Sequence, residues 1–292
     1  MGENNFDNEM VRSERALHTP GTFAKKNLLY LQEVGLLESI KPHRCVREEL
    51  NSYLFLVVLE GKGEIRIGKT AYQIKAGDAA LIDCMQHYEH VSDEKNAWKL
   101  AWAHFNGKVA KDYYELFMKL NQGENVFRVK SVNTFKCYIE ELLKNNEEKS
   151  LISELRSGEL LLKLLNDVLE GIIQKETRTS SGKQVVFEQT REFLNEHYAE
   201  KDVISQIQKE NKESIEDLNQ EFSRRYGIGI KEYVDNRRLL AAKELLRFSI
   251  KSFETIAEEV GIGNQEALNK IFRAKEGISP EEYRMKWAQW IR

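Results

Sequence analysis

The last hundred residues of the chain repeat themselves at an offset of 50 residues. The pairs of identical residues include Leu218 and Leu268, Phe222 and Phe272, Gly227 and Gly277, Ile228 and Ile278, Glu232 and Glu282, and Tyr233 and Tyr283. Internal repetition of this kind indicates two copies of one supersecondary unit. We therefore expect two helical copies, each a short helix, a tight turn and a longer helix, joined by a helix over residues 231–247.

The second copy has the pattern of a helix-turn-helix. Its short helix carries the small Ala257 where a neighbouring helix must approach, Gly261 supplies the turn, and Asn264 is the expected N-cap of the next helix. That next helix buries Leu268 and Phe272 and leaves polar side chains near its N-terminus exposed. The pattern is typical of DNA-binding units in which the second helix offers its N-terminal side chains to base edges.

These residues resemble the AraC/XylS family of transcriptional regulators. The similarity covers about residues 185–287, and its most specific parts are Ile256-Ala257, Val260-Gly261, Leu268, Phe272-Arg273, Gly277-Ile278-Ser279-Pro280 and Tyr283-Arg284. The resemblance implies two helix-turn-helix units on one long helix, with recognition helices in successive major-groove turns. It also implies four partners: double-stranded DNA, a small-molecule effector, RNA polymerase and a second copy of the chain. It favours an activator, although the residues themselves leave the direction of control open.

Matching positions in the two recognition helices are the candidate DNA contacts. Glutamine suits adenine, glutamate accepts from cytosine and lysine suits guanine. The candidates for base contacts are Gln265, Glu266, Asn269, Lys270, Glu216, Asn219 and Gln220. Basic side chains farther along each helix are better placed for phosphates. The candidates for phosphate contacts are Arg224, Arg225, Arg273 and Lys275.

The charge balance supports an alternative for this region. Residues 185–292 hold 18 basic and 20 acidic side chains, a net charge of −2, and the whole chain carries −3. Phosphate neutralisation supplies most non-specific DNA affinity, so the balance is acidic for a DNA-binding domain. In the first copy Gln208 also stands where the second has Ala257. A helix-turn-helix-derived protein-interaction module with weak DNA affinity is therefore the alternative, and we expect the second copy to read DNA more tightly.

The first third of the chain is patterned as short strands separated by glycine-containing turns. The strand-like runs are residues 53–59, 63–67, 71–74, 79–82 and 98–105. This spacing predicts an antiparallel barrel or sandwich. From Tyr113 the periodicity becomes helical, with a wide leucine-rich stripe between Leu151 and Ile172. We expect this stripe to pair two chains in a homodimer.

The expected fold is multidomain α+β, with five segments along the chain. They are an N-terminal tail (1–20), a cupin-like antiparallel β-barrel that binds the effector (21–110), a helical dimerisation segment (111–175), a polar, loop-like linker (176–184) and an all-α double helix-turn-helix domain (185–292).

The barrel segment resembles the cupin-type effector domain found in many members of the same family. The turns at residues 61–63 and 76–78, followed by the run at 98–107, carry the resemblance. Strand alternation places Trp98 and Trp102 on one face, where indoles stack on sugar rings or simply fill the core. We expect a carbohydrate effector, and both roles of the tryptophans stay open here. The candidate ligand-binding residues are Trp98, Trp102, His104, His87, Tyr88 and His90.

The residues do not favour an enzyme. In metal cupins a His-x-His pair begins the ligand set, but here the run is His43-Arg44-Cys45, and Asp83 stands where a proline normally opens the second cupin motif. No nucleotide-binding glycine pattern or nucleophile motif appears. We expect no catalytic residue, no metal and no cofactor, with a metal-dependent cupin enzyme as the alternative.

Other features bear on location. No apolar run approaches the roughly 20 residues of a bilayer span, and the first residues lack the apolar core of a secretory signal. Cys45, Cys84 and Cys137 form no CxxC pair, which is typical of a reducing compartment. We therefore expect a cytoplasmic protein without a membrane partner.

Overall fold

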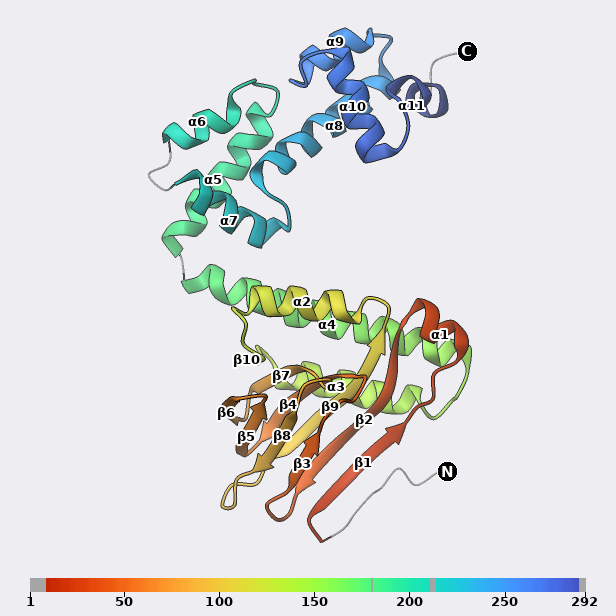
Figure 1. Cartoon of the computed structure of the whole chain (residues 1–292), viewed down its shortest axis with the longest axis vertical. Helices are drawn as coiled ribbons and strands as arrows, with labels where there is room; N and C mark the ends of the chain where they lie inside the picture. Colours follow the sequence, from red (N-terminus) through yellow and green to blue (C-terminus); the bar gives the residue numbers. More distant parts are fainter. Residues whose placement is uncertain (1–8, 180, 211–213, 289–292) are drawn as a thin grey trace. The chain divides into compact units, whose positions relative to one another are not determined.

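The computed structural model describes residues 9–179, 181–210 and 214–288, and it divides the chain into two compact units. Unit 1 is Met1–Glu176 and unit 2 is Thr177–Arg292. Figure 1 shows the strands in the first unit and a set of helices in the second. None of the described helices combines the length and the apolar composition that a bilayer span requires.

Unit 1 contains two antiparallel sheets (Figure 1). The six-stranded sheet has the order β1 (Val11–Leu17), β2 (Leu29–Ser39), β9 (Lys99–Gly107), β4 (Tyr53–Glu60), β7 (Asp78–Asp83) and β10 (Val126–Arg128). The four-stranded sheet has the order β3 (Arg44–Arg47), β8 (Tyr88–Ser92), β5 (Lys62–Ile67) and β6 (Thr70–Lys75). A short helix, α1 (Thr22–Asn27), connects β1 to β2.

Strand β4 shows why this sequence makes a two-layered domain with helices on one side. Successive side chains of a strand point to opposite faces. Leu54, Leu56 and Val58 join the core cluster that also contains residues of the four-stranded sheet. Phe55 and Val57 join the cluster that contains the helices. A nearly continuous apolar run therefore supplies both cores, because both faces of the strand are covered.

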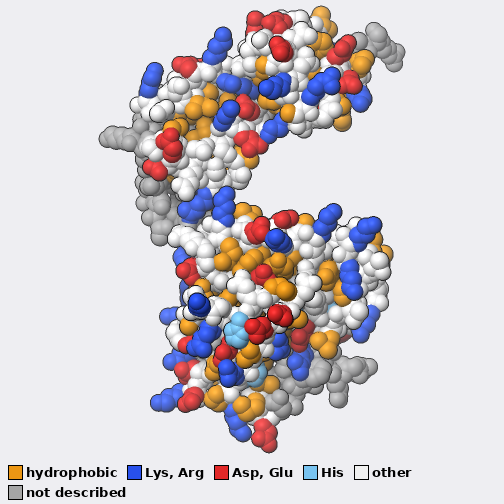
Figure 2. Space-filling model, in the orientation of Figure 1, with side chains coloured by type: hydrophobic (Ala, Val, Ile, Leu, Met, Phe, Trp, Pro, Cys, Tyr) orange, Lys and Arg blue, Asp and Glu red, His pale blue; other side chains and the backbone are white. Residues whose placement is uncertain are grey.

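Three helices cover the outer face of the six-stranded sheet: α2 (Ala110–Leu120), α3 (Val132–Asn145) and α4 (Leu151–Thr179). Leu161, Leu164 and Leu165 of α4 are at most 2% exposed and pack in the same cluster as the sheet. The prediction that this stripe pairs two chains is wrong for these leucines, because side chains of their own unit bury them. Apolar side chains of α4 that are exposed are Leu151, Ile152, Leu155 and Leu162. Figure 2 shows hydrophobic side chains gathered over α2 and α4.

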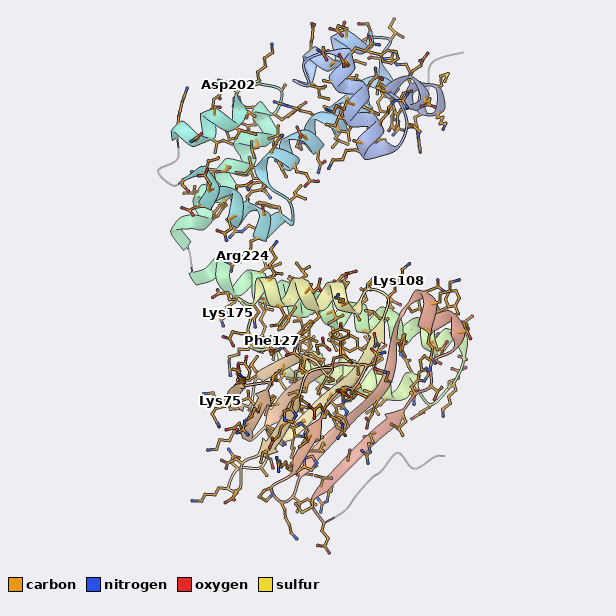
Figure 3. All side chains as sticks on the ribbon, in the orientation of Figure 1. Lys75, Lys108, Phe127, Lys175, Asp202 and Arg224 are labelled. Atoms are coloured by element: carbon orange, nitrogen blue, oxygen red, sulfur yellow. The ribbon has the colours of Figure 1, made fainter. Side chains whose placement is uncertain are left out.

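Strand β10 closes the edge of the sheet beneath these helices. Its Phe127, labelled in Figure 3, meets Phe117 of α2 edge-on, with ring centroids 5.4 Å apart. Asn125, just before the strand, donates from Nδ2 to the carbonyl of Leu81 at 2.9 Å. The predicted helical segment at residues 111–175 therefore also contains a strand.

The structure corrects two of the expected segment types. The expected tail, residues 1–20, contains β1, which pairs with β2 from Val11 opposite Ser39 to Leu17 opposite Glu33. Charged residues at alternate positions concealed this strand in the sequence. The expected loop-like linker, residues 176–184, is helical where it is described, since α4 ends at Thr179 and the next helix begins at Ser181. Residue 180 lies outside the described residues.

Unit 2 is entirely helical where it is described. Its helices are α5 (Ser181–His197), α6 (Val203–Glu210), α7 (Ile215–Tyr226), α8 (Ile230–Phe248), α9 (Phe253–Glu259), α10 (Gln265–Glu276) and α11 (Pro280–Trp287). The repeat appears as α6 and α7 in the first copy and α9 and α10 in the second. The expected joining helix over residues 231–247 is α8.

Helix α8 serves both copies with different halves. Ile230 and Val234 pack with Leu218 and Phe222 of α7 in one core. Leu239, Ala242 and Leu246 pack in the other core, which contains Leu268 and Phe272 of α10. The two copies therefore share one scaffold helix. The predicted fold class, a cupin-like antiparallel β domain followed by an all-α double helix-turn-helix domain, is confirmed.

Candidate DNA-binding and ligand-binding sites

Local interactions define both ends of helix α10. Asn264 caps it, because its Oδ1 accepts from the backbone N–H of Ala267 at 2.9 Å. Leu268 and Phe272 are fully buried against the scaffold. At the other end Gly277 takes the left-handed conformation, with φ of 73°. Ser279 then opens α11 with a capping box.

The rest of α10 presents the predicted DNA contacts on one face. Gln265, Glu266, Lys270 and Arg273 are exposed, and Asn269 is half-buried. Positions three and four residues apart lie side by side on a helix, so these five side chains form one surface. We call them the α10 face. Lys275 lies farther along, and its Nζ is 2.7 Å from Oε1 of Glu232 on α8.

In α7, the recognition helix of the first copy, the predicted contacts are arranged differently. Ser214 caps the helix by accepting from the backbone N–H of Asp217 at 3.1 Å. Glu216 and Gln220 are exposed. Asn219 uses its Oδ1 to accept from the backbone N–H of Ile230 at 2.9 Å, at the start of α8. The oxygen that Asn219 needs for pairing with adenine is thus committed to the scaffold.

The two arginines at the end of α7 are both partly buried. Arg224, labelled in Figure 3, is half-buried, and burial followed by the charge of Arg225 lowers its pKa. The guanidinium of Arg225 lies over the ring of Phe187, 5.1 Å from its centroid. Both side chains therefore pack on their own unit as well as facing solvent.

The turn between α5 and α6 connects the first copy to the second. From α8, Arg238 donates through Nε to the carbonyl of Tyr198 at 2.6 Å and through Nη2 to the carbonyl of Glu200 at 2.7 Å. Gly261, in the turn of the second copy, lies against the same segment. A Cβ added there would stand 2.6 Å from the carbonyl carbon of Ala199. These contacts fix the second turn relative to the first copy.

Unit 1 contains a cavity of about 260 Å³. It lies among the inward side chains of both sheets and of the loop before β3. The lining residues are Met10, Val11, Ser13, Arg15, Glu33, Leu37, His43, Cys45, Arg47, Leu54, Leu56, Tyr88, His90, Leu100, Trp102 and His104. A mostly apolar cavity with a few convergent polar groups is the usual form of a small-molecule site.

Three imidazoles give the cavity much of its polar character. His104 Nδ1 is 3.0 Å from Oγ of Ser52, and His90 Nδ1 forms a hydrogen bond with the hydroxyl of Tyr88. The rings of His43 and His90 are 5.4 Å apart. Burial is the main cause that lowers all three pKa values, to about 3 for His90 and about 4 for His104. At neutral pH these groups are therefore uncharged and able both to donate and to accept.

The cavity contains four of the six predicted ligand-binding residues. Trp102, His104, Tyr88 and His90 line it. Trp98 does not, because it is fully buried and packs where a Cβ on Gly63 would lie 2.5 Å from its Cε3. Its role is in the core. His87 is outside, with Nδ1 3.7 Å from Oε2 of Glu48.

Sequence reasoning missed the contribution of β3 to the cavity. In this four-residue strand Arg44 and Val46 face outward, whereas Cys45 and Arg47 line the cavity. Period-two alternation was the available signal, but the strand is too short to stand out. Gly35 is a second missed feature, since a Cβ there would lie 2.5 Å from Cη2 of Trp102. The glycine leaves room for the indole.

The metal alternative requires a cluster of donor side chains. Among the residues that the structure describes, no group of three or more His, Cys, Asp or Glu side chains is arranged to hold a metal ion.

Each unit matches a known protein-family model. A family model for an AraC-like ligand binding domain matches residues 33–165, and one for a helix-turn-helix domain matches residues 212–286. The Msm operon regulatory protein of Streptococcus mutans is 24% identical over 240 residues, which cover 80% of this chain and 84% of that protein. The lactose operon transcription activator of Staphylococcus xylosus is 21% identical over 236 residues, which cover 78% and 82%.

One solved structure that matches part of this chain is the C-terminal domain of AraT, a response regulator from Geobacillus stearothermophilus. It is 22% identical with a TM-score of 0.35, and the match covers 37% of this chain and 91% of that chain.

The barrel with its cavity and the duplicated helix-turn-helix define a transcriptional regulator with a ligand-binding domain and a DNA-binding domain. The family-model matches in both units identify the family of this regulator. The chain belongs to the AraC family of transcriptional regulators, as the sequence motifs predicted. DNA and a small-molecule effector are accordingly its partners.

Proposed function

We propose that this regulator is controlled by a sugar that binds in the cavity of unit 1. The observation that carries the proposal is the lining itself, in which the half-buried indole of Trp102 stands with three uncharged imidazoles. An indole stacks on the apolar face of a sugar ring, and imidazoles bind hydroxyls. The name of the lactose operon activator, one of the similar proteins, refers to a sugar operon and supports this choice.

We propose that the α10 face reads bases in one half of the operator. Gln265 and Lys270 are exposed near the start of a well-capped helix, where their ends meet base edges in a major groove. Truncating either one is expected to relax base preference in that half-site at a cost of about 1–3 kcal/mol. Truncation of Gln220 on α7 is expected to matter less, because acidic Glu216 and Asp217 flank it on the first turn.

The effector role is tested by Trp102→Ala, with His87→Ala as the matched control outside the cavity. DNA fragments selected by the wild-type protein would be titrated with each variant, with and without a panel of neutral and charged sugars. Trp102→Ala is expected to abolish the effect of the sugar and to leave basal DNA binding within a few-fold, whereas His87→Ala retains both. Equal loss of both functions in Trp102→Ala, together with a lowered melting temperature, would assign Trp102 to the core instead.

We also propose that the chain acts as a homodimer through the exposed apolar side chains of α4 and α2. Leu155 and Leu162 lie seven residues apart on α4 and are 43% and 38% exposed, and Leu116 of α2 is 44% exposed. Light scattering of Leu155→Asp plus Leu162→Asp is expected to give a monomer that stays folded. The buried Leu161 is unsuitable for this test, because a charge there would disrupt the core. A monomeric wild-type protein at micromolar concentration would refute the proposal.

The remaining parts of the proposal follow from the family and are tested together. We propose that the protein activates transcription in the cytoplasm by contacting RNA polymerase, and that it is not an enzyme. A reconstituted transcription reaction with purified polymerase and the selected operator is expected to give more transcript when protein and effector are both present. A decrease in transcript would make it a repressor.

A further inference from the structure

The charges that line the cavity of unit 1 do not balance. Three lining side chains carry a formal charge at neutral pH, namely Arg15, Glu33 and Arg47. Arg15 Nη1 is 3.6 Å from Oε1 of Glu33, so these two form an ion pair. Among the described residues no ion pair involves Arg47, whose own hydrogen bond runs from Nη1 to the carbonyl of Val46 at 3.0 Å. The lining therefore has one uncompensated positive charge.

The position of Arg47 directs this charge toward the cavity. Strand β3 pairs with β8 so that Cys45 lies opposite His90 and Arg47 lies opposite Tyr88, both of which line the cavity. Arg44, on the outward face of the same strand, has a carboxylate partner. Its Nε is 2.6 Å from Oε1 of Glu89. One strand thus carries a paired arginine on its outer face and, at the solvent-exposed mouth of the cavity, an arginine without a carboxylate partner among the described residues.

The charge of Arg47 also acts on the three imidazoles that line the same cavity. After burial, the charge of Arg47 is a further cause that lowers the pKa of His43 and of His104. His90 is affected by burial, by His43 and then by Arg47. Protonation of the imidazoles at neutral pH is therefore disfavoured, and Arg47 remains the cationic group that a ligand would meet.

Two polar atoms of the lining residues lack a hydrogen-bond partner. Nδ1 of His43 and Nε2 of His90 are buried and form no hydrogen bond with any described residue. A buried polar atom without a partner costs free energy, which a bound ligand recovers if it supplies hydroxyl groups. Trp102, in the same cavity, supplies a flat apolar surface. The cavity, at about 260 Å³, lies below the usual range for drug-sized ligands, which favours a small one.

Resting on the proposed effector role of this cavity, we propose that the effector is a small hydroxylated anion, a sugar acid or sugar phosphate, whose charged group binds Arg47. Arginine binds carboxylate and phosphate through paired N–H donors, and such charge-assisted bonds are about twice as strong as neutral ones. The hydroxyls of the ligand bond to His43 and His90, and its ring packs on Trp102. A neutral sugar would leave the charge of Arg47 without a counterion.

The test is calorimetric titration of the full-length protein with matched ligands. D-galacturonate, D-galactose 6-phosphate and D-galactose would be compared, together with D-glucuronate, D-glucose 6-phosphate and D-glucose. At least one anion is expected to bind more tightly than its neutral parent, and the preferred class distinguishes carboxylate from phosphate. Arg47→Gln is expected to weaken binding of that anion by about tenfold to a hundredfold. It should leave the weak binding of the neutral parent unchanged.

Arg44→Gln is the control, because it removes the same charge from the same strand on the opposite face. It is expected to retain wild-type affinity for the anion. If a neutral sugar binds at least as tightly as its acid and phosphate, or if Arg47→Gln and Arg44→Gln behave alike, the anion assignment is wrong while the effector role of the cavity stands. If none of the six compounds binds, the anion assignment is rejected together with the proposed sugar control.

Discussion

Gly261 and Gly277 provide a matched pair of substitutions in the second helix-turn-helix. Both glycines have left-handed backbones, with φ of 76° and 73°. They differ in what surrounds them. A Cβ on Gly277 would meet nothing within 4 Å, whereas a Cβ on Gly261 would lie 2.6 Å from the carbonyl carbon of Ala199 and 2.8 Å from its Cα. The pair therefore separates the cost of the backbone conformation from the cost of the contact.

The magnitudes follow from these two terms. A left-handed backbone costs a non-glycine residue roughly 1–2 kcal/mol, so Gly277→Ala is expected to lower the free energy of unfolding by that amount. Gly261→Ala carries the same cost, and it also forces the backbone at Ala199 to move. Overpacking of this kind typically costs a further 1–3 kcal/mol. The difference between the two variants is therefore expected to be about 1–3 kcal/mol.

Hydrogen exchange of the full-length protein measures this difference locally. Amides of α9 and α10 report the opening free energy of the second copy, independently of the unfolding of unit 1. Gly261→Ala is also expected to weaken operator binding more than Gly277→Ala, because Ala199 belongs to the turn that relates the two copies. Equal protection losses in the two variants would show that the approach of Gly261 to Ala199 does not hold the second turn in place.

Three more predictions concern single side chains. Burial, and then the charge of Arg47, lowers the pKa of His104 to about 4, below the unfolded value of 6.5. The folded state therefore has the full stability contribution of neutral His104 above pH 6.5 and loses it as the pH falls toward 4. Between pH 7 and pH 5 this amounts to about 2 kcal/mol, so thermal unfolding of His104→Gln should be less sensitive to acid than that of the wild type, and parallel curves would contradict the reasoning. Asn219→Ala should destabilise unit 2 by about 1 kcal/mol in urea, because it removes the acceptor for the Ile230 N–H, while base preference stays unchanged; an altered preference at constant stability would make Asn219 a base contact. In salt titrations of DNA binding, Arg273→Ala should flatten the slope of log affinity against log salt concentration by about one unit. Lys275→Ala should flatten the slope less, because Lys275 forms an ion pair with Glu232. A larger effect of Lys275→Ala than of Arg273→Ala would show that Lys275 contacts the phosphates.

The helices of unit 2 could be predicted because their signals are local. Asn264 caps α10 and Ser279 caps α11, each within three residues of the amide that it satisfies. Gly277 ends α10 in the left-handed conformation that its position requires. The repeat then transfers the same boundaries to the first copy. It does not transfer every environment, since Gln208 is exposed whereas Ala257, its counterpart, is fully buried.

The features that the sequence did not reveal depend on contacts between distant residues. Helical periodicity indicated that Leu161 and Leu165 lie on one apolar face, but it carries no information about whether a sheet or a second chain covers that face. Likewise Arg47 becomes a cavity residue only because β3 pairs with β8. Asn219 looked like a base contact by its place in the repeat. Its bond to Ile230, 11 residues away, depends on the angle at which α8 leaves the turn.

The acidic balance of residues 185–292 has a physical origin in the many short helices of this region. Helix N-termini carry partial positive charge and favour carboxylates, and an acidic residue occupies the first turn of every helix from α7 to α11. Glu282 closes the capping box of α11, and Glu254 of α9 accepts from the backbone N–H of Gln265 at 2.7 Å.

Such carboxylates are offset by backbone amides, which a count of charged side chains omits. The net charge of residues 185–292 therefore reflects how their helices begin and is a poor guide to DNA affinity. The charge that decides that affinity is local to the recognition surface. On the α10 face Lys270 and Arg273 are exposed and Glu266 is the acidic member. Its carboxylate stands at the helix N-terminus, where removing it would also remove a favourable interaction with the helix dipole. Glu266→Gln should therefore strengthen non-specific DNA binding at a small cost in stability, and an unchanged affinity in low salt would show that this face does not approach phosphates.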